Sequence, residues 1–98
     1  MNQRRPLSSA ELQASLTDMA GWQEIDGNLA KSYKFSSFAA AIGWMVSVAI
    51  YADKIDHHPE WSNVYNRVQV NLVTHDLDNA ISTWDLDLAK KMDDLASY

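Results

Sequence analysis

The sequence predicts an α+β fold: a four-stranded antiparallel sheet with three helices packed on one face, in the order α-β-β-α-β-β-α. Two pairs of short β-type runs are each joined by a tight-turn signal, and a long proline-free apolar stretch separates the pairs. Serines stand at the start of the helical stretches, where they can cap them. Helices and antiparallel hairpins in separate segments are typical of α+β proteins. The 98 residues are expected to form one domain, residues 1–98, with a single core.

The first element is predicted to be a short helix over residues 9–19. Ser8 stands three residues before Glu11, which is the spacing of a capping box. Apolar residues then recur at helical intervals: Leu12, Leu16 and Met19. Gly21 is expected to end this helix.

A β-hairpin is predicted next, because Asp26-Gly27 is a turn signal between two β-type runs. The second run alternates Leu29, Lys31, Tyr33 and Phe35 with Ala30, Ser32 and Lys34. This alternation indicates a strand with two different faces.

The central segment, capped by Ser36 or Ser37, is predicted to be a helix to about Lys54. At 100° per residue it carries two apolar stripes. The first stripe comprises Phe38, Ile42, Met45 and Ala49, and the second Trp44, Val48, Tyr51 and Ile55. The first is expected to cover the sheet, and the second to pack against the terminal helices or a second subunit. We favour some subunit contact.

A second hairpin and a final helix complete the predicted fold. After Pro59 we expect a short strand, a turn near residues 65–66, and a longer strand that reaches His75 if it continues that far. Val68, Val70 and Leu72 would share one face of this strand. Ser82 is expected to cap the last helix, in which Leu86, Ala89 and Met92 recur at helical spacing.

Charge and composition exclude several classes of function. The formal net charge is -5 with only eight basic residues, scattered along the chain, so direct nucleic-acid binding is not expected. No cysteine is present for disulfide or thiolate chemistry. The two arginines near the start have no apolar stretch behind them, and no segment approaches the length of a membrane span. We therefore expect a cytoplasmic protein without a membrane partner.

The residues able to carry chemistry at neutral pH are the three histidines, His57, His58 and His75. Histidine can both give and take a proton near pH 7, and a nearby carboxylate orients its ring. Asp53 lies one helical turn before His57, and Asp56 is adjacent to it. These are the parts of a proton-transfer site, and no recognisable nucleophile accompanies them.

The same residues also allow interpretations other than proton transfer, namely purely structural roles or a zinc site. His57 and His58 could simply end a helix, where the dipole favours a cation and Pro59 blocks continuation. His75 alone would be a polar residue at a strand end. Three histidines and a carboxylate also match a zinc site by ligand type, although adjacent histidines seldom converge on one ion.

Three stretches stand in register around these residues: "HHPEWSNVYNRV", "VTHD" around His75, and "DLDLA" beginning at Asp85. Together they resemble the signature of the pterin-4a-carbinolamine dehydratase family. The resemblance extends from the hairpin at Trp22 onward, and the predicted helix order agrees with the family fold. It implies a lyase that dehydrates 4a-hydroxytetrahydrobiopterin, the carbinolamine left by aromatic amino-acid hydroxylases, to the quinonoid dihydropterin. It implies no metal and no organic cofactor.

The resemblance also implies roles for particular residues. Three histidines would form the acid/base and pterin-contacting set: His57, His58 and His75. The substrate-binding positions would be Asp53, Asp56, Asp85 and Trp61, with the first two as supporting carboxylates and Trp61 framing the site by packing. Which histidine is the acid and which the base stays open. Asp85 could equally be an acidic residue placed in the first turn of the last helix by the dipole.

Two departures from the family pattern concern the pocket. The stretch from His75 to Asp85 is one residue longer than in many relatives, and Trp84 stands where some members have an arginine. We expect these differences to affect pterin affinity or the preferred pterin side chain.

The partners implied are a pterin substrate and further copies of the chain, as a homodimer or homotetramer. The alternative function is a non-catalytic protein-binding or dimerisation module, like the family members that act as transcriptional coactivators. The complete histidine set favours catalysis, because a pure binding module would be free to lose it.

Overall fold

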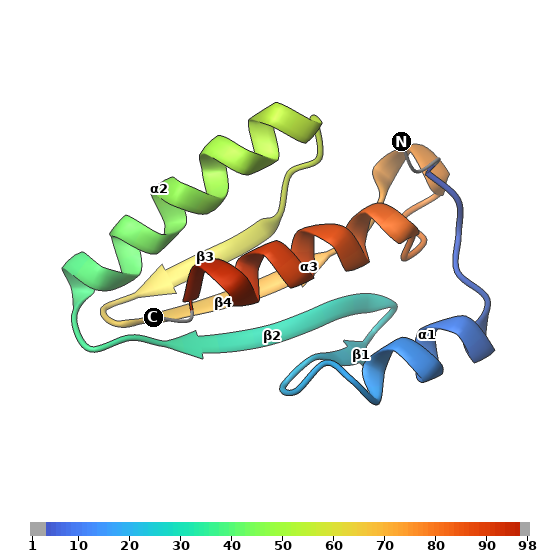
Figure 1. Cartoon of the computed structure of the whole chain (residues 1–98), viewed down its shortest axis with the longest axis horizontal. Helices are drawn as coiled ribbons and strands as arrows, with labels where there is room; N and C mark the ends of the chain where they lie inside the picture. Colours follow the sequence, from blue (N-terminus) through green and yellow to red (C-terminus); the bar gives the residue numbers. More distant parts are fainter. Residues whose placement is uncertain (1–3, 97–98) are drawn as a thin grey trace.

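The computed structural model describes residues 4–96 and confirms the predicted α+β architecture (Figure 1). In chain order the elements are α1 (Ser9–Leu16), β1 (Gln23–Ile25), β2 (Asn28–Lys34), α2 (Phe38–Ile55), β3 (Glu60–Val64), β4 (Arg67–Leu72), a 3₁₀ turn η1 (His75–Leu77) and α3 (Thr83–Ala96). The four strands form one antiparallel sheet in the order β1-β2-β4-β3. The two hairpins therefore join through their inner strands, β2 and β4.

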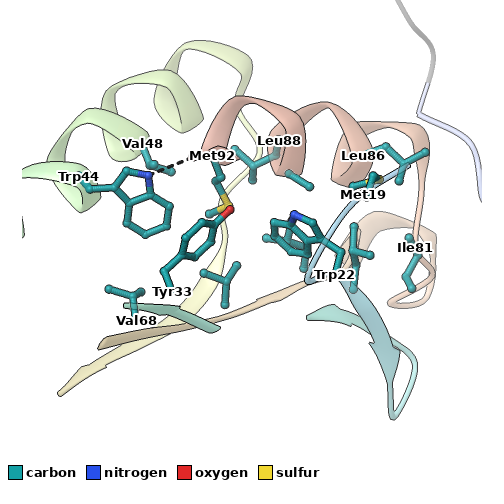
Figure 2. Packing of buried hydrophobic residues seen from close by; sticks show 14 of the residues in the cluster. Met19, Trp22, Tyr33, Trp44, Val48, Val68, Ile81, Leu86, Leu88 and Met92 are labelled. Atoms are coloured by element: carbon teal, nitrogen blue, oxygen red, sulfur yellow. Dashed lines mark hydrogen bonds between the residues drawn. The ribbon is translucent and has the colours of Figure 1, made fainter. Parts of the chain in front are cut away.

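One face of the sheet is apolar and the other is polar. Pairing of β2 with β4 runs from Leu29 opposite Leu72 to Lys34 opposite Arg67. The apolar face carries the most buried strand side chains: Leu29, Tyr33, Val68, Val70 and Leu72. The opposite face carries polar residues such as Ser32 and Gln69, which hydrogen-bond each other. All three helices contribute buried side chains to the single core cluster on the apolar face (Figure 2).

The predicted hairpin turns are confirmed. Asp26 and Gly27 have φ of 52° and 81°, and positive φ at both central residues suits a tight two-residue hairpin loop. The second turn lies at Tyr65 and Asn66, between β3 and β4, with Tyr65 at φ 54°.

Helix α1 has the predicted start but ends earlier than expected. Ser8 and Glu11 form the complete capping box. The helix stops at Leu16 rather than Met19, because the chain tightens into i→i+3 turns, in which the Asp18 and Met19 amides donate to the Ser15 and Leu16 carbonyls. Met19 is nevertheless buried, so the apolar spacing marked a core residue beyond the helix.

Helix α2 presents its second apolar stripe to the core, so the expectation that the first stripe covers the sheet was wrong. Its buried residues are Ala41, Trp44, Val48 and Ala52. The Trp44 ring lies 4.4 Å from that of Tyr33 on β2, between centroids, and its indole N–H donates to the Met92 carbonyl of α3 at 3.0 Å (Figure 2). The stripe thus packs on the sheet and on the C-terminal helix together, which leaves most of the first stripe outside.

The outer side of α2 carries a row of exposed apolar residues spaced four apart, which we call the α2 outer stripe. Its members and exposed fractions are Phe38 (51%), Ile42 (36%), Val46 (54%) and Ile50 (68%). Spacing of four places them in one row along the helix. Such a continuous exposed row is unusual for a surface that stays in water.

Among residues 4–96, α2 is also the helix whose length and composition would allow it to cross a membrane, with 18 residues and a mean hydropathy of 1.4. The expectation that no segment approaches this length was therefore wrong. Core helices of globular domains meet the same criteria. The packing of Trp44 and Val48 places α2 in the core layer of this fold.

A partly buried carboxylate ties α3 to the other side of the core. Asp93 accepts hydrogen bonds from Lys31 Nζ at 2.8 Å, from Trp22 Nε1 at 3.0 Å and from the Tyr33 hydroxyl. Burial, reinforced by the hydrogen bond to Asp93, raises the pKa of Tyr33, so its hydroxyl remains a donor. One side chain of α3 thereby satisfies three donors around β1 and β2.

Replacing Asp93 by Ala should destabilise the fold by about 2–4 kcal/mol, because three donors lose their shared acceptor. Chemical denaturation measures this, with Asp94→Ala as the matched control on the exposed side of the same turn; that control should change stability by less than about 0.5 kcal/mol. Equal effects of the two variants would contradict the role given to Asp93.

Candidate active site

Three segments meet in one cavity at the end of the sheet where α2 stops and α3 begins. The segments are the turn after α2, the stretch from β4 into η1, and the N-terminal segment. The cavity has a volume of about 300 Å³ and is lined by Arg4, Asp56, His57, His58, Pro59, Glu60, Val73, Thr74, His75 and Asp76. All three histidines of the chain therefore share it.

The end of α2 aims His57 inward. Asp56 takes the left-handed conformation, with φ 53° and ψ 47°, and closes the helix. The amide of His57 then donates to the Ala52 carbonyl at 3.1 Å, and Pro59 prevents the helix from resuming. The His57 side chain is only 6% exposed as a result.

Behind His57 lies a fully buried carboxylate. Asp85, 0% exposed, places Oδ1 2.6 Å from His57 Nε2. Its Oδ2 accepts from the Thr74 hydroxyl at 2.9 Å and from the Ser82 amide at 2.8 Å. The Thr74 and Ser82 hydroxyls are themselves 2.6 Å apart. Every oxygen of this buried carboxylate therefore has a donor, as a buried charge requires.

Asp85 also serves the start of α3, as the helix-dipole interpretation expected. The Trp84 amide donates to Ser82 Oγ at 3.2 Å while the Ser82 amide donates to the Asp85 carboxylate. This reciprocal arrangement resembles a capping box, with aspartate in the third helical position and the serine hydroxyl accepting from the second helical amide instead of the third. The capping contact and the His57 contact use different oxygens of the same carboxylate, so the two interpretations are compatible.

His58 and His75 lie in more open positions. The Nε2 of His58 is 2.9 Å from Asp53 Oδ1, and both side chains are mostly exposed. His75 has an acceptor at each ring nitrogen: Asn79 Oδ1 lies 2.8 Å from Nδ1 and Glu60 Oε2 lies 3.2 Å from Nε2.

His75 does not end a strand, contrary to one expectation. β4 stops at Leu72, and His75 opens the 3₁₀ turn η1. The reason is Thr74, whose backbone bridges to Ala80 and whose side chain is buried against Asp85. These contacts bend the chain away from the sheet and toward α3.

The remaining predicted residues occupy different places. Asp56 lines the cavity, whereas Asp53 contacts it only through His58. Trp61 is not among the lining residues; its ring faces the core, 6.0 Å from that of Trp44 between centroids. Trp61 therefore supports the site through packing of β3.

Sequence reasoning assigned no role in the site to four polar residues of the cavity lining: Arg4, Glu60, Thr74 and Asp76. Thr74 and Asp76 had a signal, since they flank His75 in the "VTHD" stretch, and Glu60 lies within "HHPEWSNVYNRV". Arg4 had none, because it is more than fifty residues from every segment that it contacts.

The cavity residues are paired with separate partners rather than gathered around one point. Within residues 4–96, no group of three or more His, Asp or Glu side chains is arranged to hold a metal ion. His57 and His58 each direct Nε2 at a different aspartate. A larger cavity of about 420 Å³ lies between α1 and α3, lined by acids and Lys90 but by no histidine.

Residues 5–95 match the model of a family described as pterin 4 alpha carbinolamine dehydratase. The chain belongs to this family. It is 43% identical, over 95% of its length and 97% of theirs, to proteins of Brucella ovis and Brucella canis named "putative pterin-4-alpha-carbinolamine dehydratase". It also resembles the crystal structure of a "transcriptional coactivator/pterin dehydratase" from Brucella melitensis, with a TM-score of 0.90, 41% identity, and coverage of 95% of this chain and all of that one.

Membership confirms the resemblance drawn from the histidine motif and extends it. The sequence likeness was evident from Trp22 onward, and the match also takes in α1 and the segment before it. The chain is thus a lyase of the dehydratase class with a pterin substrate.

The two aspartate–histidine pairs of the site should differ sharply in their effect on stability. Asp85→Ala breaks a buried pair and should cost about 3–5 kcal/mol of unfolding free energy. Asp53→Ala breaks an exposed pair of the same type and should cost less than about 1 kcal/mol. Denaturation of both variants checks this; a small cost for Asp85→Ala would mean that the buried network does not hold the site.

Proposed function

We propose that this protein dehydrates 4a-hydroxytetrahydrobiopterin in the histidine cavity, by acid/base catalysis, and so recycles the cofactor of aromatic amino-acid hydroxylases. The observation that carries the proposal is the convergence of all three histidines on one cavity, with one of them held by a buried carboxylate. Family membership supplies the substrate class. The proposal needs no metal or organic cofactor, and it includes the cytoplasmic location expected from the sequence.

The reaction breaks the C4a–O bond and forms a C4a=N5 double bond. One proton must reach the departing hydroxyl, which leaves as water, and another must leave N5. Two imidazoles on a flat heterocycle can carry both transfers, and positioned acid/base groups of this kind contribute about 10²–10⁴-fold each.

His57 is suited to accept a proton. A neutral imidazole has one donor and one acceptor nitrogen. The Nε2 of His57 faces the Asp85 carboxylate, which accepts two other donors and is therefore best matched by an N–H. That leaves Nδ1 as the basic nitrogen of the ring, and Asp85 stabilises the imidazolium once the proton arrives.

His75 is suited to give a proton. The Asn79 and Glu60 oxygens beside its ring nitrogens are acceptors for ring N–H groups, and because the His75 and Glu60 side chains are mostly exposed, the departing hydroxyl can replace Glu60 at Nε2 and take that proton. We assign His57 as base, His75 as acid, and His58 to pterin contact at the open side of the cavity, where it is 56% exposed.

Replacing His57 or His75 by Ala should lower the dehydration rate by about two or more orders of magnitude, because each removes one proton transfer. The assay follows decay of 4a-hydroxytetrahydropterin generated by a phenylalanine hydroxylase. Ser62→Ala, on an exposed part of β3 outside the cavity, is the control and should keep the wild-type rate. The proposal would be contradicted if folded wild-type protein did not accelerate the decay of 4a-hydroxytetrahydropterin, or if both histidine variants kept the wild-type rate.

We further propose that the protein is a homo-oligomer assembled through the α2 outer stripe. Four exposed apolar residues in one row fit the same row of a second copy, since a self-complementary patch is the usual basis of a two-fold interface. The stripe lies opposite the residues of α2 that face the core, so assembly leaves the fold unchanged.

Ile50→Glu should shift the particle to a smaller mass in sedimentation experiments, because it places a charge at the most exposed position of the stripe. Ile25→Glu is the matched control: Ile25 is 47% exposed on β1, away from α2, and its replacement should leave the mass unchanged. A monomeric wild type would contradict the proposal and leave the stripe available to another protein, the coactivator-like alternative.

A further inference from the structure

Arg4 lies outside the residues matched by the family model, 5–95, yet its side chain lines the histidine cavity. The backbone beside it explains how it reaches that place. The Leu7 amide donates to the Ile81 carbonyl at 2.9 Å, and the Thr83 amide to the Arg5 carbonyl at 3.3 Å. Residues 5–7 thus run antiparallel to residues 81–83, and this pairing places Arg4 beside the start of α3.

The guanidinium of Arg4 contacts the end of α2 and η1 together. One terminal nitrogen donates to the backbone carbonyls of Ile55, at 3.4 Å, and Asp56. Ile55 is the last residue of α2 and Asp56 caps it, and carbonyls at the C-terminal end of a helix lack partners within the helix. The other terminal nitrogen lies 3.2 Å from the Asp76 carboxylate. With these contacts the side chain is only 26% exposed.

Arg4 also contacts the aromatic residue that precedes Asp85. Its Cζ lies 4.7 Å from the centroid of the Trp84 ring, a cation–π geometry. The Trp84 indole N–H is buried and has no hydrogen-bond partner among residues 4–96, so contacts of the ring rather than the N–H orient this side chain. The Trp84 ring in turn lies 6.3 Å from that of His57, between centroids.

Each segment held by Arg4 carries a residue of the proposed site. Asp56 directly precedes His57 and His58, Asp76 directly follows His75, and Trp84 directly precedes Asp85. Of the described residues that line the cavity, Arg4 is also the only arginine or lysine, whereas three of the others are acidic.

We propose that Arg4 is a positioning residue for the dehydration. It acts as a clamp, holding the turn after α2, η1 and the start of α3 in the relative positions that bring the three histidines together. This inference rests on the proposed function for its catalytic consequence. Both terminal nitrogens of Arg4 donate to acceptors of the protein, so the proposal has Arg4 act through the histidines and not through the pterin. Loss of the clamp lets the histidines shift, and misplacement of reacting groups by about 1 Å can cost about a hundredfold in rate.

Arg5 provides a matched control in the next position of the chain. It points away from the cavity and pairs with Glu11 of α1 at 2.8 Å, and hydrogen bonding to Arg5 is the main cause that lowers the Glu11 pKa to about 2. Arg5→Gln therefore removes the same charge from the same segment without touching the cavity.

The test compares wild type with Arg4→Gln, Arg4→Lys and Arg5→Gln in the dehydration assay, well below the thermal midpoint of each. Arg4→Gln should lower kcat by about tenfold to a hundredfold while KM changes by less than about threefold. Arg4→Lys should recover only part of the rate, because an ammonium cannot hold two carbonyls, a carboxylate and a ring face together. Arg5→Gln should match wild type. Unchanged kcat in Arg4→Gln, or a rise in KM alone, would overturn the clamp.

Ring spectra of the three histidines separate failure of the clamp from failure of the proposed function. Long-range ¹⁵N–¹H NMR should show shifted ring resonances for His57 in Arg4→Gln, because the neighbouring Trp84 ring moves, and wild-type positions in Arg5→Gln. If the wild type proves inactive, the proposed function fails, and these spectra alone then decide whether Arg4 positions the histidines. Identical spectra of Arg4→Gln and wild type would overturn the clamp, whereas a shift confined to Arg4→Gln would support it.

Discussion

The site depends on one constraint: the carboxylate of Asp85 is fully buried and must be surrounded by donors. The donors come from three separate parts of the chain, namely His57 after α2, Thr74 after β4 and the Ser82 amide before α3. A buried carboxylate that lost any of them would carry a large desolvation cost. Satisfying this one group therefore forces the ends of three elements to meet, and it fixes His57 at the wall of the cavity.

The core holds these ends in place. β2 and β4 pair along their length at the centre of the sheet, and α2 and α3 cover the apolar face as neighbours, joined by the Trp44–Met92 hydrogen bond. The end of α2 and the start of α3 then lie at the same end of the sheet (Figure 1). Arg4 adds a second connection at this end, outside the core, between segments that share no strand pairing.

Local patterns were sufficient to predict the elements and the histidine motif, but not how they face one another. Capping serines, the Asp26-Gly27 turn and strand alternation predicted the element order, because each acts over a few residues. The assignment of the two stripes of α2 failed, because both are apolar and only the fit of Trp44 between the sheet and α3 decides which one turns inward. Thr74 bends the chain at His75, and this bend depends on contacts with distant residues. Arg4 reaches the cavity from near the start of the sequence. Its contact with Asp76 spans more than seventy residues, and contacts of this kind leave no local pattern in the sequence.

The most direct test of this account is where a pterin binds. In an NMR titration with 7,8-dihydrobiopterin, the ring resonances of His57, His58 and His75 and the backbone amides of residues 73–76 should shift together and saturate at one affinity. Saturable shifts confined to the larger cavity between α1 and α3, around Asp18 and Lys90, would show that the histidine cavity is not the active site.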